Sequence, residues 1–421
     1  MKPYHGDGLT LYPLKEGARQ YLKASYPVRY GQYAEILDRH YSYQFNLNGE
    51  IKFVQGQSHH WHHNDWLKRT AANDWIYYSA NGYAGVESML GEQYLPCLSY
   101  ESSHYAAVNP FETAPVKKAL AAAGNLHARI ADLTGSVGDE EVRTFLQRAA
   151  ANDAAMLASR ARLLHAIIGS RVTVLPPDTR HVDYDVIPVM IADGCLYQCG
   201  FCSVKTGRDF ALRSRQDILR QLEKLRDFYG PDLRNYNSLF LGQHDALFAG
   251  WEHIGFTLET AYELFQFKDS RMNGANAFMF GSVGSLLAAP DSLFQALNKT
   301  PFYTCINIGL ESAQQEALDV LQKPLQERRV REAFLKMMDI NKTCDRIEIT
   351  ANFVTGEPLP ESHVSSLIDL VKRSAERQCS KGAIYLSPLS SPKPVKAVKA
   401  QLFDLKRNSR IPVFLYIMQR L

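Results

Sequence analysis

Three cysteines, Cys195, Cys199 and Cys202, stand in the stretch DGCLYQCGFCSVKTG at 193–207. Thiolates are strong ligands of zinc and of iron–sulfur clusters, and two of them separated by two residues can reach one metal centre from a single tight turn. A tetrahedral zinc site or an ordinary iron–sulfur cluster takes four ligands. The spacing therefore predicts a metal centre at which one position is either kept open or filled from elsewhere in the chain.

The other cysteines do not form a disulfide framework. The total of seven is odd, and the remaining four are scattered singly, at Cys97, Cys305, Cys344 and Cys379. Residues 1–17 lack the apolar core of a signal peptide, and apolar runs such as 411–418 are too short to span a bilayer. We therefore expect a cytoplasmic protein that keeps its thiols reduced and has no membrane partner.

Length and charge set wide bounds on function. At 421 residues, with 46% hydrophobic and 22% charged residues, the chain is long enough for two domains that each have a core. The 47 basic and 44 acidic residues leave a formal net charge of +3. This surplus does not by itself indicate a nucleic-acid partner, although a local basic patch is compatible with it.

The second part of the chain alternates short apolar runs with amphipathic helical segments. Alternation of this kind predicts a parallel sheet, and six such units without a dinucleotide glycine fingerprint favour a partial α/β barrel. Ligands of such barrels gather at the carboxyl ends of the strands, and the cysteine stretch follows the first strand at that end. The six candidate strands span 186–192, 238–242, 277–282, 303–309, 346–354 and 382–388.

The first part of the chain predicts an α+β domain. A β-hairpin is expected at 41–54, where a three-residue loop with Gly49 in the left-handed region pairs Phe45 with Ile51. Helical spacing of apolar residues predicts helices within 114–168. The prolines of 174–184 suggest a boundary, which gives three ranges. These are an N-terminal domain at 1–175, the barrel at 180–390 and a C-terminal extension at 391–421.

One N-terminal segment, 58–100, combines histidines with tryptophans. Four histidines lie between His59 and His63, and they can bind a metal or form a solvated loop. Trp61, Trp66 and Trp75 can fill a small core or line a substrate pocket. Because a partial barrel leaves its carboxyl rim exposed, we expect part of this segment to cover the strand ends as a substrate lid.

Three motifs together resemble those of the radical S-adenosylmethionine (SAM) superfamily. The first is Cys195-x3-Cys199-x2-Cys202 with the aromatic Phe201 before the last cysteine. The blocks NIGLESAQQEALDVLQKP at 307–324 and NFVTGEPLPES at 352–362 are similar to the fourth strand with its helix and to the fifth-strand turn. They look like the branch of oxygen-independent coproporphyrinogen oxidases and the Elongator catalytic subunit. The resemblance extends over roughly 186–390 and implies a partial (β/α)6 TIM-like barrel.

The resemblance also implies cofactors, a reaction and a partner. In this superfamily three thiolates hold a [4Fe-4S] cluster, whose fourth iron binds the amino and carboxylate groups of SAM. Reductive cleavage of SAM gives a 5′-deoxyadenosyl radical that abstracts hydrogen from an organic substrate, here unidentified. Electrons come from a small reductant protein of the flavodoxin or ferredoxin type. The open ligand position then has a use, because a cosubstrate completes the site.

Individual residues match positions of the family's SAM site. Phe201 corresponds to a residue near the adenine, and Glu311 and Asn352 correspond to residues that bind the ribose hydroxyls. Lys323 corresponds to a basic residue that pairs with the methionine carboxylate. The pair Gly242-Gln243 stands where a glycine-rich turn receives the methionine amino group, but the sequence there is GQHD in place of glycine-glycine-acid.

Each of these residues also has an ordinary structural interpretation. The three cysteines can hold zinc together with a histidine such as His244, and Glu311 and Lys323 can stabilise the ends of the intervening helix. Phe201 can serve packing, Asn352 can end a strand, and Gly242 can serve only the turn. An alternative function is therefore an iron–sulfur or zinc protein for binding or electron transfer that keeps the fold without SAM cleavage.

Overall fold

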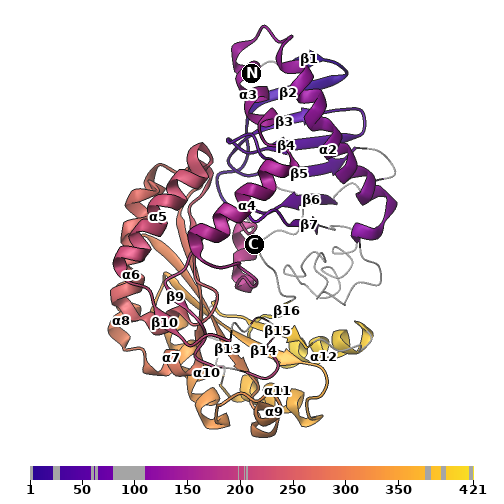
Figure 1. Ribbon diagram of the computed structural model, residues 1–421. Coiled ribbons are helices and arrows are strands. Elements are labelled where there is room, and N and C mark those ends of the chain that lie inside the picture. The colour runs from indigo at the N-terminus through magenta and orange to yellow at the C-terminus, as the bar shows by residue number, and fades with distance from the viewer. Residues whose placement is uncertain are drawn as a thin grey trace.

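Two large sheets with different strand directions dominate the computed structural model (Figure 1). The first is antiparallel and has the order β1-β2-β3-β4-β5-β6-β7, and the second is parallel and has the order β16-β15-β14-β13-β12-β11-β8. The residues that the structure describes are 3–21, 29–57, 61, 65–78, 110–197, 199–202, 204, 207–374, 381–389, 395–416 and 421. Cys97, Cys379 and all four histidines of 59–63 lie outside them.

The N-terminal sheet is a meander in which each strand pairs with the next one along the chain. One face packs against α2 and α3 through an apolar cluster that includes Leu11, Tyr43 and Phe145. The strands are β1 (Tyr4–Gly6), β2 (Leu9–Glu16), β3 (Gln32–Leu37), β4 (Tyr41–Phe45), β5 (Ile51–Gly56), β6 (Trp66–Arg69) and β7 (Trp75–Tyr78). The 3-10 helix η1 (Pro110–Glu112) precedes α2 (Ala114–Thr134), α3 (Glu140–Ala150) and α4 (Ala154–Ile168).

The β4–β5 hairpin has the irregular register that its loop sequence predicts. Gly49 has φ +79°, and Phe45 pairs with Ile51, whereas Gln44 pairs with Phe53. The bulge between these pairs turns Phe53 to the opposite face from Phe45. Phe53 consequently packs on Trp66, with ring centroids 5.3 Å apart, rather than in the cluster that covers Phe45.

The parallel sheet contains the six strands expected from the sequence and one more. They are β8 (Ile187–Val189), β11 (Ser238–Leu241), β12 (Ala275–Ser282), β13 (Phe302–Glu311), β14 (Ile347–Thr355) and β15 (Ile384–Pro388). The seventh, β16 (Val413–Leu415), is parallel to β15 and comes from the range expected to be an extension. Within the described residues the sheet is open, with β8 and β16 at its edges. The fold is therefore a mixed α/β fold with an open parallel sheet.

Helices connect the parallel strands and cover one face of their sheet (Figure 1). They begin and end as follows: α5 (Arg215–Tyr229), α6 (Gly250–Leu264), α7 (Val283–Ala288), α8 (Asp291–Lys299), α9 (Gln315–Val320), α10 (Glu327–Thr343), α11 (Ser362–Ser374) and α12 (Val395–Asn408). Short 3-10 helices are η3 (Gly230–Asn235), η4 (Ala246–Ala249) and η5 (Phe267–Asp269). Among the described residues, no helix is both long enough and apolar enough to cross a membrane.

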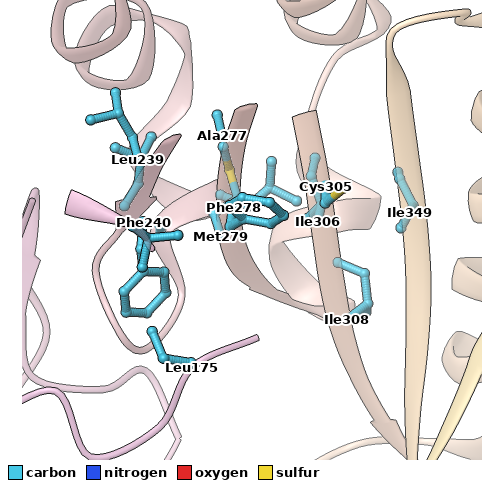
Figure 2. Packing of buried hydrophobic residues seen from close by; sticks show 14 of the residues in the cluster. Leu175, Leu239, Phe240, Ala277, Phe278, Met279, Cys305, Ile306, Ile308 and Ile349 are labelled. Carbon is cyan, nitrogen blue, oxygen red and sulfur yellow. The ribbon is translucent and has the colours of Figure 1, made fainter. Parts of the chain in front are cut away.

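The segment 169–186, here called the linker, runs along the sheet from the carboxyl ends of the strands to their amino ends. Near its start, the Thr173 amide donates to Gln243, which follows β11. Leu175 then joins the apolar cluster that contains Phe240 of β11 (Figure 2). Further on, in η2 (Pro177–Val182), the Asp178 carboxylate accepts hydrogen bonds from the hydroxyls of Thr350 (2.9 Å) and Tyr385 (2.8 Å). The linker is therefore buried against the sheet over most of 174–186.

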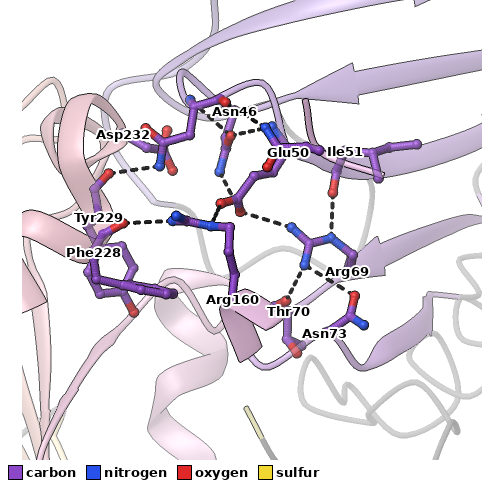
Figure 3. A network of polar contacts seen from close by, with 12 residues as sticks. Asn46, Glu50, Ile51, Arg69, Thr70, Asn73, Arg160, Phe228, Tyr229 and Asp232 are labelled. Atoms are coloured by element: carbon purple, nitrogen blue, oxygen red, sulfur yellow. Dashed lines mark hydrogen bonds and ion pairs between the residues drawn. The ribbon is translucent and has the colours of Figure 1, made fainter. Parts of the chain in front are cut away.

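The N-terminal sheet meets the parallel sheet at the amino ends of β8 and β11. Lys68, only 1% exposed, donates to the carboxylate of Asp183 (3.0 Å) and lies 3.0 Å from that of Asp185, just before β8. Next to this pair, Glu50 accepts from Arg69 and also pairs with Arg160 of α4 (Figure 3). Buried charges of this kind are tolerated only when each has a partner, so the junction has one defined geometry.

Three tryptophans of the proposed lid belong to this junction and to the N-terminal core. Trp61 and Trp75 pack in the cluster between the N-terminal sheet and its helices, and Trp66 packs on Phe53 beside Lys68. None of the three covers the carboxyl ends of the parallel strands, so the expectation of a lid is wrong for these residues. Residues 79–100 of the same segment lie outside the described part of the chain.

Asp232 makes the junction sensitive to pH. Burial raises the pKa of this carboxyl from 3.8 to about 6, although Lys52 and hydrogen bonds from Asn235 and Leu47 oppose the shift. Between pH 4 and pH 6 the folded state thus binds more protons than the unfolded chain, so this group lowers the free energy of unfolding as the pH rises. The loss is on the order of 2–3 kcal/mol by pH 7.

We expect Asp232→Asn to remove this dependence. The asparagine oxygen still accepts from Asn235 and Leu47, but the side chain no longer ionises. The melting temperature of the variant minus that of the wild type should rise between pH 4.5 and pH 6.5 and then level off. Asp227→Asn, whose side chain is 70% exposed, is the control and should show a small difference at every pH. If the difference in melting temperature between Asp232→Asn and the wild type does not change with pH, the raised pKa of Asp232 is contradicted.

Candidate functional site

The three cysteines lie in the loop of a small hairpin at the carboxyl end of β8. Its strands are β9 (Ala192–Asp193) and β10 (Ala211–Leu212), which pair antiparallel. At the base of the loop, Gly194 has φ +74°, and a Cβ there would lie 2.0 Å from the carbonyl oxygen of Asp209. The Arg213 guanidinium donates two hydrogen bonds to the Asp193 carboxylate, at 2.8 and 2.5 Å. This hairpin, the cysteine hairpin, therefore has a fixed base.

The thiols of the loop are free and close to one another. Cys199 is buried, and Cys195 and Cys202 are partly buried. The amide of Cys202 donates to the Cys199 carbonyl (3.3 Å), which closes a turn between the last two cysteines. Burial raises the pKa of the Cys199 thiol, while the charge of Lys323 opposes this rise. Lys323 is therefore near enough to stabilise thiolates at this site.

Glu311 ends β13 in an unusual backbone conformation. Its φ is +64°, in the left-handed region that non-glycine residues rarely adopt, and a bulge separates it from Gly309 in the pairing with β14. Gly309 has no side chain to obstruct this arrangement, since a Cβ there would lie 2.6 Å from the Glu311 Oε1 atom. The conformation directs the carboxylate toward Lys323, and strain of this kind is common at binding sites.

A chain of hydrogen bonds crosses the carboxyl ends of three adjacent strands. Lys323 follows α9, and its Nζ atom lies 3.0 Å from Glu311 Oε1, with both side chains 8% exposed. Asn352 of β14 donates to Glu311 Oε2 at 3.4 Å, and Ser387 of β15 donates to the Asn352 Oδ1 atom at 2.8 Å. Three residues selected from the sequence therefore lie together, and Ser387 joins them.

The charge of Lys323 is stabilised by this setting. Burial alone would lower the pKa of Lys323, but the Glu311 carboxylate and the nearby Cys199 thiol raise it above its ordinary value. The Nζ atom also lies 5.7 Å from the ring centroid of Tyr197, which stands between Cys195 and Cys199 in the loop. Lys323 thus links the cysteine hairpin electrostatically to the polar ends of β13 and β14.

Gln243 has a different setting from the other selected residues. Its Oε1 atom accepts from the Thr173 amide (2.9 Å) and hydroxyl (3.1 Å), and its Nε2 atom donates to Ser170 (2.9 Å). The side chain, in a residue 8% exposed, is thus engaged by the linker. Gly242 before it has φ +77°, so glycine suits this position by its conformation. Phe201 lies partly buried between Cys199 and Cys202.

The linker contact predicts a local effect of mutation. Gln243→Ala removes three hydrogen bonds and leaves the Thr173 amide without its partner, which should lower the free energy of unfolding by about 1–3 kcal/mol. Amide hydrogen exchange at 170–175 should accelerate, because this contact holds the start of the linker. Gln216→Ala, at an exposed position of α5, is the control and should change neither quantity.

The next two residues, His244 and Asp245, lie at the same strand end. Burial lowers the pKa of His244, and its Nε2 atom makes no hydrogen bond to the described residues. Burial raises the pKa of Asp245, a shift opposed by Ser282 and Ser285 at the start of α7. Tyr197 also approaches α7, since a Cβ at Gly284 would lie 2.6 Å from its hydroxyl. The cysteine loop and the end of β11 therefore meet at α7.

The residues present fit an iron–sulfur cluster by their chemistry. Three free thiols interact electrostatically in one loop, with the cation of Lys323 beside them. Among the residues that the structure describes, no group of three or more His, Cys, Asp or Glu side chains has the arrangement of a metal-ion site. Residues 198, 203, 205 and 206 of the loop lie outside the described residues. The donor set is therefore suitable, and a cluster would draw the thiols into its own ligand geometry.

Sequence reasoning missed residues whose partners are distant in the chain. Ser387, Tyr197 and Arg213 all contribute to the site, through Asn352, Lys323 and Asp193. Only Tyr197 had a direct signal, because it lies within the cysteine motif. Ser387 lies near the carboxyl end of a candidate strand, where ligands gather, which is a weaker signal.

Known proteins provide structural similarity only. No protein-family model matches the chain, and no curated protein matches it. A radical SAM methyltransferase from Sphaerobacter thermophilus aligns with TM-score 0.39 and 14% identity over 55% of this chain and 65% of that one. SuiB from Streptococcus suis aligns with TM-score 0.39 and 10% identity over 90% and 72%.

A third solved structure, the cobalamin-dependent S-adenosylmethionine radical enzyme OxsB, aligns with TM-score 0.34 and 13% identity. The alignment covers 52% of this chain and 30% of OxsB. All three TM-scores are below 0.5.

Proposed function

We propose that this protein is a radical SAM enzyme that acts on an organic substrate. The observation that carries the proposal is the meeting of three free thiols with the buried Glu311–Lys323 pair at the carboxyl ends of a parallel sheet. A structural zinc site has no need for a buried ion pair next to its thiolates. A cosubstrate with both charged and hydroxyl groups does need such partners.

Each residue has a role in this proposal. Cys195, Cys199 and Cys202 would hold a [4Fe-4S] cluster. Glu311 would accept a hydrogen bond from a ribose hydroxyl of SAM, Asn352 would donate one to the ribose, and Lys323 would pair with the SAM carboxylate. The bound cluster would supply the electron for cleavage of SAM to methionine and a 5′-deoxyadenosyl radical. The open parallel sheet then serves as the partial barrel expected from the sequence.

The protein's own contribution is to orient the cosubstrate and to exclude water. Glu311 and Lys323 are ordered by their mutual ion pair, which would lower the conformational entropy that is lost when SAM binds. Burial of both side chains strengthens these interactions, because the effective dielectric constant is lower there than in water. The linker packs on the sheet through Leu175 and Asp178, and both residues are shielded from water there.

One observation favours a second candidate function. Gln243, at the position expected to receive the methionine amino group, has its amide engaged by Ser170 and Thr173. If no other group takes this role, the protein can bind a cluster without positioning SAM for cleavage. It would then be an iron–sulfur protein for binding or electron transfer. His244 and Asp245 are the polar side chains nearest in sequence that can replace Gln243.

A single anaerobic experiment separates these functions. The protein is reconstituted with iron and sulfide, reduced with dithionite, and mixed with SAM. The proposed enzyme should form 5′-deoxyadenosine and methionine in amounts that depend on the reduced cluster. A complete cluster without 5′-deoxyadenosine would favour the second candidate, and zinc in place of iron would overturn both.

A further inference from the structure

We propose that His363 is a positioning residue that holds Glu311 in the orientation in which it meets Lys323 and would bind the ribose of SAM. This inference rests on the proposed function, because it assigns a residue that supports the same site. His363 lies in the first turn of α11, directly after the 352–362 block, and is 2% exposed. It acts through Ser312, the residue that follows Glu311, rather than by touching the ligand.

Glu311 is the centre of a strained three-residue turn. Its φ is +64°, and the Ser312 amide donates to the Leu310 carbonyl at 2.8 Å, which closes the turn. A γ-turn with a positive φ at its central residue is the rare and strained form. Strain of this kind persists only where surrounding contacts hold the backbone in place. The residues next to Glu311 must therefore be fixed by other parts of the chain.

Two hydrogen bonds of His363 provide this constraint. Its Nδ1 atom lies 2.9 Å from the Ser312 hydroxyl oxygen, and its Nε2 atom lies 2.8 Å from the Val354 carbonyl oxygen of β14. Because a carbonyl can only accept, Nε2 carries the proton, and the neutral ring accepts through Nδ1 from the Ser312 hydroxyl. Burial lowers the pKa of His363, which favours this neutral form. His363 thus ties the residue after Glu311 to β14.

Ser312 extends the constraint to the start of α9. Its hydroxyl oxygen accepts from the amide of Gln314, which directly precedes α9, at 3.1 Å. The Gln314 side chain donates to the Ser362 hydroxyl at 2.8 Å, which is a second link between this turn and α11. Lys323 follows α9. The two links therefore fix the chain between the partners of the buried ion pair.

A serine hydroxyl beside a histidine nitrogen is also the arrangement of a nucleophile with its base. Ser312 is 0% exposed, and its oxygen already contacts both the Gln314 amide and His363, so a substrate cannot reach it. The geometry is therefore that of a support for the site and not of a reacting pair.

Two substitutions separate the contacts of His363. An asparagine amide is placed to replace Nδ1, and a glutamine amide is placed to replace Nε2. His363→Asn therefore keeps an acceptor for Ser312 and loses the bond to Val354, whereas His363→Gln keeps the Val354 bond and loses the Ser312 bond. In calorimetry with the reconstituted protein, His363→Gln should raise the Kd for SAM on the order of 3-fold to 30-fold, and His363→Asn should keep most of the affinity.

A second measurement needs neither cluster nor SAM. Glu311→Ala should lower the urea midpoint of unfolding less in the His363→Gln background than in the wild type, because a carboxylate that is not held in place pairs less well with Lys323. Asn237→Ala is the control for a general loss of stability. Asn237 is 0% exposed, and its amide donates to two backbone carbonyls just before β11, at the opposite end of the sheet. This variant should lower the midpoint and leave the Kd for SAM unchanged.

The outcomes separate this inference from the proposed function. A higher Kd in His363→Gln than in His363→Asn, with the smaller effect of Glu311→Ala in the His363→Gln background, supports the positioning role. Equal Kd values in the two variants, or additive losses with Glu311→Ala, overturn it while the proposed function stands. If His363→Gln does not fold, Ser312→Ala removes the same contact and takes its place in both measurements. A wild type that assembles a cluster and does not bind SAM overturns both proposals.

Discussion

Replacing Cys199 by Ala should abolish the iron–sulfur cluster. We expect the wild type to retain about four iron atoms per chain after anaerobic reconstitution, and the variant to retain almost none. The reason is that only three thiols are present in the cysteine hairpin, and Cys199, the most buried of them, interacts with the other two. Loss of one ligand leaves two thiolates for four irons. Iron content and the visible absorption of the cluster give the measurement.

Two buried cysteines elsewhere provide the control. Cys305 and Cys344 are 3% and 8% exposed and lie in the apolar cluster of the parallel sheet. Cys305→Ala and Cys344→Ala should keep the full iron content, since their thiols are outside the hairpin. A Cys199→Ala variant that retained a full cluster with SAM-dependent spectral changes would contradict the ligand assignment.

Replacing Glu311 by Ala should have the second large effect. In the folded protein without SAM, the change leaves the buried Lys323 without its carboxylate, which should cost about 3–5 kcal/mol in the free energy of unfolding. With SAM, it removes an acceptor for the ribose, which should weaken binding by about 1–3 kcal/mol. Urea unfolding measures the first effect, and calorimetry with the reconstituted protein measures the second.

A double-mutant cycle tests whether Glu311 acts through Lys323. If the ion pair dominates, Glu311→Ala combined with Lys323→Met should be less destabilised than the sum of the two single changes. The control is Glu327→Ala, which breaks a partly exposed pair with Arg331 and should affect stability and SAM binding little. Unchanged SAM affinity in Glu311→Ala would leave this residue with a structural role only.

The sequence by itself determined the features that depend on neighbouring residues. The spacing of Cys195, Cys199 and Cys202 predicted a short loop after a strand. The alternation of apolar runs with helical segments predicted six parallel strands, and the structure contains them. The register of the β4–β5 hairpin followed from Gly49, because only a glycine-containing loop of that length pairs Phe45 with Ile51. Such features can be read directly because residue type and local geometry are linked within a few positions.

The seventh strand required the tertiary structure. β16 (Val413–Leu415) lies in the apolar run 411–418, which lacks the alternation that distinguishes a strand from another core segment. It becomes a strand because α12 returns the chain beside β15, whose exposed edge offers backbone hydrogen bonds. The deciding interaction therefore lies with a neighbour that the local sequence does not contain.

The setting of the site was also decided by long-range packing. The Gln243 side chain is hydrogen-bonded to Thr173, 70 positions earlier. Trp66 packs on Phe53 beside the Lys68–Asp183 pair, and Trp61 and Trp75 pack in the N-terminal core. Each placement depends on the path of the linker along the sheet and on buried charges that must find partners. Neither constraint leaves a periodic signal in the sequence. Residue spacing could therefore identify the chemical groups of the site, whereas the chain path determined which of them remain available to a ligand.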